Sequence, residues 1–173
     1  FTNLLSSSIT KFNPKTFKII TEIAVGPYPE DIVYWDNLVF VANSGFGDYY
    51  QNLTKAGTIS VIDVSSNQEV FNIDSTPNAV KLLINPKNKM LYIGCYTLYS
   101  TDEQVGNIIE YNLVSWKVQR RWKTDITDFN LSRTGDTLYW VNIDGLNLID
   151  LTKSEAKTEN IISNPNKNEH WYS

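Results

Sequence analysis

In this 173-residue sequence, the side chains that could bind a ligand or take part in catalysis are mainly aromatic rings and carboxylates. The candidates lie mostly in the segments that connect predicted strands. Two long loop segments, 44–57 and 96–106, carry five aromatic residues that no strand pattern requires: Phe46, Tyr49, Tyr50, Tyr96 and Tyr99. Shorter connections add Tyr28, Glu30, Asp31, Asn78, Asp125 and Asp128. Rigid rings beside a few polar groups are typical of a surface that binds a ligand or a partner protein. The alternative is that these tyrosines only fold over and close their own loops.

Other reactive side chains are scarce, which excludes several kinds of site within this segment. One cysteine, Cys95, and one histidine, His170, leave no basis for a disulfide framework, a Cys-rich metal site or a His-based triad. Acidic pairs such as Glu30 and Asp31 lack the Asp-x-Asp-x-Asp-Gly spacing of a calcium loop, so we expect no metal site. No cofactor motif is present, and we expect no bound cofactor. Cys95, which closes a predicted strand, is expected to be an inert core residue.

Net charge and hydropathy limit the classes of partner that this sequence could bind. The net charge is −4 without a basic stripe, which argues against nucleic-acid binding. No apolar run approaches the roughly 18 residues of a membrane span. With 42% hydrophobic residues, the chain can bury a core.

An internal repeat organises the chain. Segments 8–14, 58–64, 107–113 and 145–151 each alternate apolar and polar residues and then contain an Asn or Asp. That residue stands at 13, 63, 112 and 150, so the spacings are 50, 49 and 38 residues. The pattern predicts a half-buried strand that runs into a turn, where the Asn or Asp side chain bonds its own backbone two residues on.

Three more β-rich stretches accompany each copy, so the predicted unit has four strands. The first strands are predicted at 31–34, 79–84 and 128–131, the second at 38–43, 90–95 and 137–142, and the fourth at 17–23, 69–73, 117–122 and 157–162. Tandem four-stranded units of roughly 40–50 residues are typical of β-propeller blades. We therefore predict an all-β protein, a β-propeller with about three and a half blades in this chain. A β-sandwich with coincidental spacing is the alternative.

The first complete repeat also resembles a known family. Its segments Gly26-Pro-Tyr-Pro-Glu-Asp-Ile-Val33, Leu38-Val-Phe-Val-Ala-Asn-Ser-Gly45 and Gly57-Thr-Ile-Ser-Val-Ile-Asp-Val64 look like one repeat of the YVTN β-propellers. The match weakens later, where Tyr92-Ile-Gly-Cys95 replaces the Tyr-Val-x-Asn pattern. The resemblance implies a secreted, periplasmic or surface-anchored bacterial propeller, a group that includes proteins that capture corrinoids, and a ring of typically about seven blades.

The phase of the repeat predicts part of a ring. A half blade is expected at 8–23, whole blades at 27–73, 77–122 and 126–162, and the entry to another blade at 163–173. Since a blade cannot bury both faces alone, the other half of the propeller is an expected partner, from the same parent chain or from a second chain. Large aromatic residues of the strand pattern are expected in the core between blades: Phe12, Phe40, Phe71, Tyr92, Tyr111, Trp116, Trp122, Tyr139 and Trp140.

The leading functional hypothesis is a non-enzymatic propeller at the bacterial cell envelope. Its loop face would bind a small-molecule ligand or an envelope protein, in the periplasm or at the outer surface. One alternative is a propeller enzyme, lactonase-like or a redox-cofactor oxidoreductase, whose channel-mouth site the other half completes. Another is a structural subunit of an envelope assembly, favoured if Phe17, Val70 and Trp122 face solvent.

Overall fold

The computed structural model shows an all-β chain and describes residues 1–47, 50, 52–74, 78–98, 106–155 and 157–166. Within these ranges every regular element is a strand, and none of them forms a helix that could span a membrane. The predicted Tyr49, Tyr99 and His170 lie outside the described residues.

The strands form four antiparallel sheets, and each strand pairs with the next one along the chain. The first sheet has three strands: β1 (Thr2–Asn3), β2 (Ser8–Phe12) and β3 (Ile19–Ala24). The second has β4 (Pro29–Trp35), β5 (Leu38–Asn43), β6 (Thr58–Asp63) and β7 (Gln68–Ile73). The third has β8 (Ala79–Asn85), β9 (Met90–Cys95), β10 (Asn107–Asn112) and β11 (Lys117–Lys123). The fourth has β12 (Asp128–Leu131), β13 (Thr137–Asn142), β14 (Gly145–Asp150) and β15 (Glu159–Ser163).

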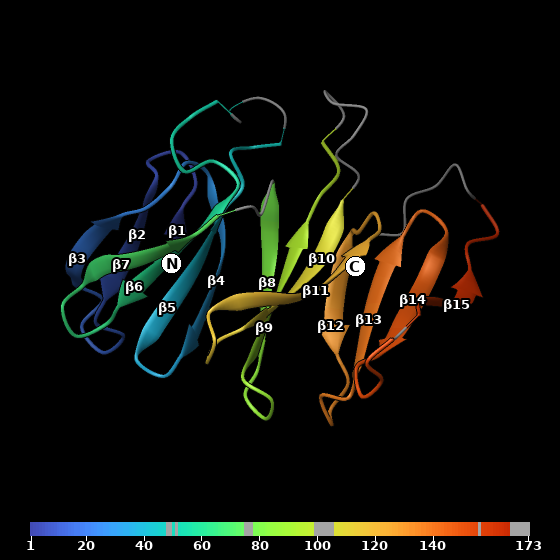
Figure 1. Ribbon diagram of the computed structural model, residues 1–173. Helices are drawn as coiled ribbons and strands as arrows, with labels where there is room; N and C mark the ends of the chain where they lie inside the picture. The colour runs from blue at the N-terminus through green and yellow to red at the C-terminus, as the bar shows by residue number, and fades with distance from the viewer. Residues whose placement is uncertain (48–49, 51, 75–77, 99–105, 156, 167–173) are drawn as a thin grey trace.

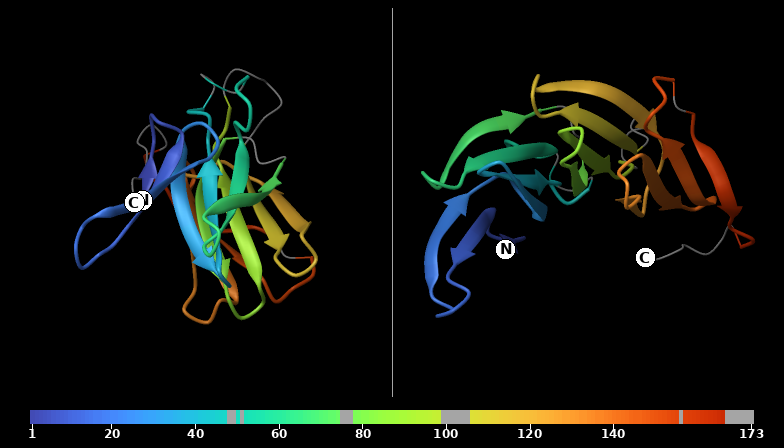
Figure 2. Two further views of the ribbon diagram at one scale, coloured as in Figure 1. Left: turned by 90° about the vertical axis from the view of Figure 1, so that its left-hand side faces the viewer. Right: turned by 90° about the horizontal axis from the view of Figure 1, so that it is seen from below.

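The sheets stand side by side in chain order (Figure 1), and from below they follow an open arc (Figure 2). Strands β1, β4, β8 and β12 contact one another in turn along the inside of this arc. Four-strand meanders placed around an axis are the blades of a β-propeller, so the predicted fold class is confirmed. We call the contacts between successive sheets the first, second and third junctions.

The predicted turns are confirmed in all four sheets, and each lies between the last two strands of its sheet. The side-chain oxygens of Asn13, Asp63, Asn112 and Asp150 each accept a hydrogen bond from a backbone amide two or three residues further on, at 2.7–3.2 Å. Asn and Asp favour this geometry because their short side chains reach the following backbone. The repeat seen in the sequence is therefore a repeated strand and turn.

A second repeated feature, a hydrogen-bond motif of an Asn side chain, was not predicted from the sequence because no strand was assigned to residues 1–7. The Asn3 side-chain amide donates to two hydroxyls of β2, at 2.8 and 2.9 Å. The amide of Asn43 does the same at the end of β5, to Thr58 and Ser60 at 3.1 and 3.0 Å. β1 is therefore the end of a second strand of a blade, and Asn3 is the counterpart of Asn43.

The middle of the arc holds the largest side chains. Phe40, Tyr92 and Trp140 are buried between sheets, together with Tyr111 and Trp122, as predicted. Sheets with a neighbour on each side bury side chains of both faces, which is why Val39 to Asn43 of β5 read as a nearly continuous apolar run.

The core prediction is wrong for three aromatic residues. Phe12, Phe71 and Trp116 keep 39%, 46% and 37% of their surface in solvent. Phe12 is the last residue of β2, Phe71 lies in β7 at the edge of its sheet, and Trp116 lies in the turn between β10 and β11. Alternation along a strand predicts the face of a side chain but not how far the neighbouring sheet extends.

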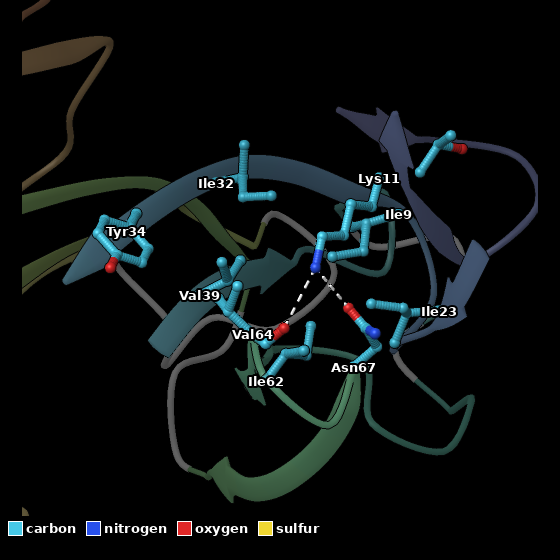
Figure 3. Close-up of a pocket in the computed structure, with 10 residues that line it drawn as sticks. Ile9, Lys11, Ile23, Ile32, Tyr34, Val39, Ile62, Val64 and Asn67 are labelled. Carbon is cyan, nitrogen blue, oxygen red and sulfur yellow. Dashed lines mark hydrogen bonds between the residues drawn. The ribbon is translucent and has the colours of Figure 1, made fainter. Parts of the chain in front are cut away.

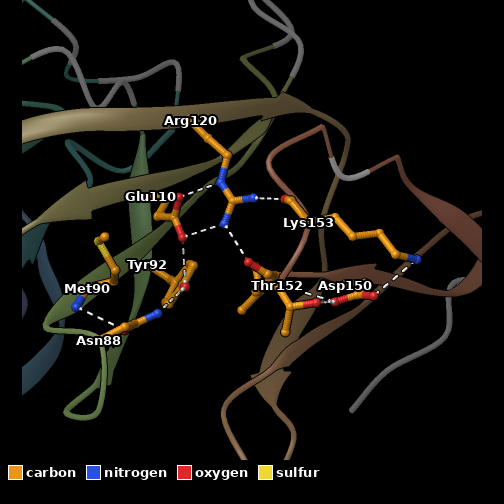
Figure 4. A network of polar contacts seen from close by, with 9 residues as sticks. Asn88, Met90, Tyr92, Glu110, Arg120, Asp150, Thr152 and Lys153 are labelled. Carbon is orange, nitrogen blue, oxygen red and sulfur yellow. Dashed lines mark hydrogen bonds and ion pairs between the residues drawn. The ribbon is translucent and has the colours of Figure 1, made fainter.

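A buried polar network crosses the third junction (Figure 4). The Glu110 carboxylate accepts hydrogen bonds from the Tyr92 hydroxyl at 2.9 Å and from the Arg120 guanidinium at 2.5 and 2.8 Å. Arg120 also donates to the carbonyl oxygens of Leu151 and Lys153 in the fourth sheet. Glu110 is only 2% exposed, so the pairing with Arg120 offsets the cost of removing its carboxylate from water.

Candidate functional site

The candidate site lies on the end of the sheets that carries the long loops, the upper end in Figure 1. The connections β3–β4, β7–β8 and β11–β12 reach this end, as do β5–β6, β9–β10 and β13–β14. We call this end the loop face. The β13–β14 turn spans only residues 143–144 and is tight, as the sequence predicts.

Three predicted aromatic residues meet there in one stack. The Tyr28 ring stacks with both of the others, with its centroid 5.1 Å from that of Phe46 and 4.8 Å from that of Tyr50. The interplanar angles are 28° and 11°. Phe46 is 46% exposed and Tyr50 is 39% exposed, so the stack keeps ring surface open to solvent. We call these three residues the aromatic stack.

The backbone that positions the stack is in a conformation that bulky residues rarely adopt. Tyr28 has φ of 52° and Phe46 has φ of 57°. Ser44 holds both: its amide and hydroxyl donate to the Tyr28 carbonyl at 3.1 and 3.2 Å, and its hydroxyl accepts from the Phe46 amide at 2.9 Å. Such strain persists only where surrounding contacts fix it, and it is common at binding sites.

The stack affects the titration of one of its members. A hydrogen bond with Tyr50, followed by partial desolvation, raises the pKa of Tyr28. Beside the stack, desolvation raises the pKa of Glu30 despite its exposed surface, and a hydrogen bond with Ser44 partly opposes that rise. Ser44 was not predicted as a site residue, although it directly follows the Asn that ends the second strand.

A second group forms around Tyr96, whose hydroxyl donates to the Thr127 carbonyl at 2.7 Å. Burial raises the pKa of Tyr96 most, and the nearby charges of Glu30, Asp128 and Asp125 raise it further. Carboxylates of β4, of β12 and of the β11–β12 connection therefore lie close enough to act on a tyrosine of the third sheet. We call Glu30, Asp125 and Asp128 the acidic cluster.

Several predicted site residues are engaged in holding the sheets together. The two carboxylate oxygens of Asp31 accept the backbone amides of Ile32 and Leu82, both at 2.8 Å, which ties β4 to β8. Asp128 pairs with Lys81 at 3.0 Å across the third junction. Lys81 was not singled out in the sequence, because nothing there shows that it faces Asp128.

The remaining polar candidates have similar internal partners. Asn78 is 4% exposed, and its carbonyl accepts the Tyr96 amide at 3.1 Å. Asp125 accepts a hydrogen bond from the Thr97 hydroxyl at 2.7 Å. Asn78 and Asp125 therefore shape the loops, while the stack, Glu30 and Tyr96 present surface to solvent.

The described residues contain no group of three or more His, Cys, Asp and Glu side chains arranged to hold a metal ion. Cys95 is fully buried, and desolvation raises the pKa of its thiol to about 12, so it is an unreactive core residue as predicted.

No protein-family model and no curated protein matches the chain. Among solved structures it is similar to hydrazine synthase of Kuenenia stuttgartiensis, with a TM-score of 0.71 and 19% sequence identity. The match covers 90% of this chain and 48% of the other, so the chain spans about half the length of that structure. At this identity the likeness concerns the fold alone, and it supports a β-propeller.

Proposed function

We propose that this chain is part of a non-enzymatic β-propeller that binds a ligand or a partner protein through its loop face. The observation that carries the proposal is the stack of Tyr28, Phe46 and Tyr50 beside Glu30. Three stacked rings, two of them on residues with positive φ, Tyr28 and Phe46, are costly to maintain at a solvent-facing edge for loop closure alone.

The chemistry of this surface favours a flat or cationic group. An aromatic ring offers a negative face for stacking and for cation–π contact, worth roughly 0.5–1 kcal/mol at exposed sites. Glu30, which bonds the same Ser44 that holds Tyr28, adds a negative charge beside the stack, and it also lies near Tyr96. A ligand that joins a flat ring to a positive charge would use both features.

Localisation at the bacterial periplasm or outer surface is part of the proposal. It is supported by the motifs of the first complete repeat, which resemble those of YVTN propellers at bacterial envelopes. A role as a structural subunit of an envelope assembly is a second candidate, because Phe17 and Val70 are 80% and 58% exposed. Trp122, by contrast, is buried and gives that candidate no support.

Titration with benzyltrimethylammonium, a cation that joins a flat phenyl ring to a quaternary ammonium group, tests the proposal by calorimetry. We expect saturable binding that weakens at least about threefold in Tyr28→Ala and in Glu30→Gln, because each removes one recognition feature. Tyr34→Ala is the matched control: Tyr34 is 65% exposed at the opposite end of β4 and should leave binding unchanged. Equal affinities for all the variants would contradict the proposal.

A further inference from the structure

A cavity of about 270 Å³ lies at the third junction, at the end of the sheets opposite the loop face (the lower end in Figure 1). Its walls come from the β8–β9 turn, from the end of β12 and from the β12–β13 turn. Two cations line it, Lys87 and Arg133, and none of its described lining residues is a carboxylate. Asp136, which directly follows the lining turn, is exposed and does not line the cavity. The cavity is therefore positively charged, in a chain whose net charge is −4.

The cavity between the first and second sheets has a different lining (Figure 3). It measures about 240 Å³, and aliphatic side chains such as Ile9, Ile32 and Ile62 form most of its walls. The one cation among its described lining residues is Lys11, whose ammonium donates to the Val64 carbonyl at 3.2 Å and to Asn67 Oδ1 at 2.8 Å. Protein oxygens therefore hold that ammonium, and the surface left open there is aliphatic.

A short polar side chain lines the cavity of the third junction where the second junction has a large ring. Trp35 pairs with Leu38, the first residue of β5, and packs against the core of the second junction. Asn85 pairs with Met90, the first residue of β9, so it holds the same place in its sheet. Asn85 is only 3% exposed and donates to the Gly135 carbonyl at 2.9 Å. A Cβ at Gly135 would lie 2.7 Å from Asn85 Nδ2, and φ there is 78°, so glycine lets the two turns approach this closely.

Side chains of the lining carry donors that the fold does not use. Within the described part of the chain, no hydrogen bond or ion pair joins the Arg133 guanidinium to another residue. The Asn130 side-chain oxygen accepts the Leu131 amide at 2.9 Å, which leaves its NH₂ group to donate. The Lys87 ammonium donates to the Thr134 carbonyl at 2.5 Å and keeps two further N–H groups. Donors from the third and fourth sheets therefore border one cavity.

We propose that this cavity binds a phosphate group, with Lys87 and Arg133 contacting different oxygens from two neighbouring sheets. Arginine pairs with phosphate through two parallel N–H bonds, and lysine adds a point charge. A phosphate monoester carries a charge of about −1.5 to −2 near pH 7, which two cations match. A carboxylate carries a single charge and two oxygens, so it would use this pair less fully. The site lies away from the loop face and does not depend on the proposed function.

An NMR titration of the unaltered protein with sodium phosphate tests the proposal, at pH 7 and constant ionic strength so that general screening stays the same. We expect saturable shifts of the Thr134 and Gly135 amides. Binding should weaken at least about threefold in Arg133→Gln and in Lys87→Gln, because each variant loses one charged hydrogen bond. Lys89→Gln is the matched control, since Lys89 is exposed in the same turn as Lys87 but does not line the cavity.

Three further ligands identify the chemistry and source of the anion. Sodium acetate should bind more weakly than phosphate. Glycerol 3-phosphate should bind at least as tightly as phosphate if the ligand is a soluble phosphomonoester. Co-sedimentation with phosphatidic acid vesicles that is lost in Arg133→Gln would assign the phosphate to a lipid headgroup. The proposal is overturned if phosphate does not saturate, if acetate binds as tightly, or if Lys89→Gln weakens binding as much as Arg133→Gln.

Discussion

The second and third junctions occupy equivalent places in the repeat but use opposite chemistry. Phe71 and Arg120 hold equivalent positions, opposite Val61 and Glu110 in the strand before them. Phe71 packs on Trp116 in the next sheet, with ring centroids 5.5 Å apart. Arg120 instead bonds the carbonyl oxygens of Leu151 and Lys153.

At the first junction the contact comes from a different strand: Lys11 of β2, which stands at the position of Val61 and Glu110, donates to the Val64 carbonyl and to Asn67 Oδ1. Asn67 and Trp116 hold the same position in their turns, with φ of 55° in both. In each junction, one side chain contacts the turn between the last two strands of the following sheet. A side-chain contact with this turn is therefore present at all three junctions, whereas the chemical type of the contact differs: ammonium to oxygen at the first, aromatic at the second and guanidinium to carbonyl at the third.

The largest effect is expected where the contact is charged. Arg120→Ala should destabilise the chain by about 3 kcal/mol, because it leaves the Glu110 carboxylate buried without its partner. Urea unfolding measures the change. Replacing both residues, Glu110→Gln with Arg120→Met, should recover at least about half of the loss. Equal losses in the single and double variants would show that the charge is not the cause.

A smaller loss is expected from overfilling the third junction. A Cβ at Gly94 would lie 2.4 Å from Phe129 Cε1 and 2.6 Å from Ile126 Cδ1. Gly94→Ala should therefore cost about 1–3 kcal/mol, seen as a lower thermal midpoint. Adding Phe129→Leu removes the clashing ring atom and should restore part of the midpoint. No change in Gly94→Ala would contradict the close packing described.

A matched aromatic pair tests whether the neighbouring sheet matters. Phe17 and Trp116 share the same turn position, with φ of 56° and 55°, and Trp116 packs on Phe71 of the preceding sheet. Trp116→Ala should cost about 1–2 kcal/mol in urea unfolding. Phe17→Ala should stay within about 0.5 kcal/mol, because Phe17 is 80% exposed. Similar losses at both sites would contradict the junction model.

The smallest effect concerns acid stability of the turns. Hydrogen bonds from Ser66 lower the pKa of Asp63, and those from Thr152 and Lys153 lower the pKa of Asp150, from an ordinary value of 3.8. A lowered carboxyl pKa contributes stability above that value, which is lost as pH falls through the folded-state pKa. Asp63→Asn with Asp150→Asn should therefore lose less stability between pH 7 and pH 2 than the parent. The natural Asn13 and Asn112 turns show that Asn fits this position. A steeper acid loss would contradict this assignment.

Much of the fold could be predicted from the sequence, because alternation and turn residues are local signals. The third-strand segments and the Asn or Asp turns recur within a few residues of their predicted places. β1 was missed because it has only two residues in strand geometry, too few for a period. Exposure of Phe12 and Phe71 was missed because it depends on how far a neighbouring sheet reaches.

The candidate site was predictable in composition but not in arrangement. Loop length and aromatic content pointed to Tyr28, Phe46 and Tyr50, yet only the structure shows that they stack. Asp31 looked equally available in the sequence. Its use by the Leu82 amide follows from a contact 51 residues away, which no local pattern reports.

The most direct test of loop-face binding is an NMR measurement of intermolecular NOEs from the methyl protons of benzyltrimethylammonium to the protein. We predict NOEs to the ring protons of Phe46 and Tyr50, whose surfaces are exposed beside Glu30. NOEs only to Tyr34 or Phe17, away from the loop face, would contradict the proposed function.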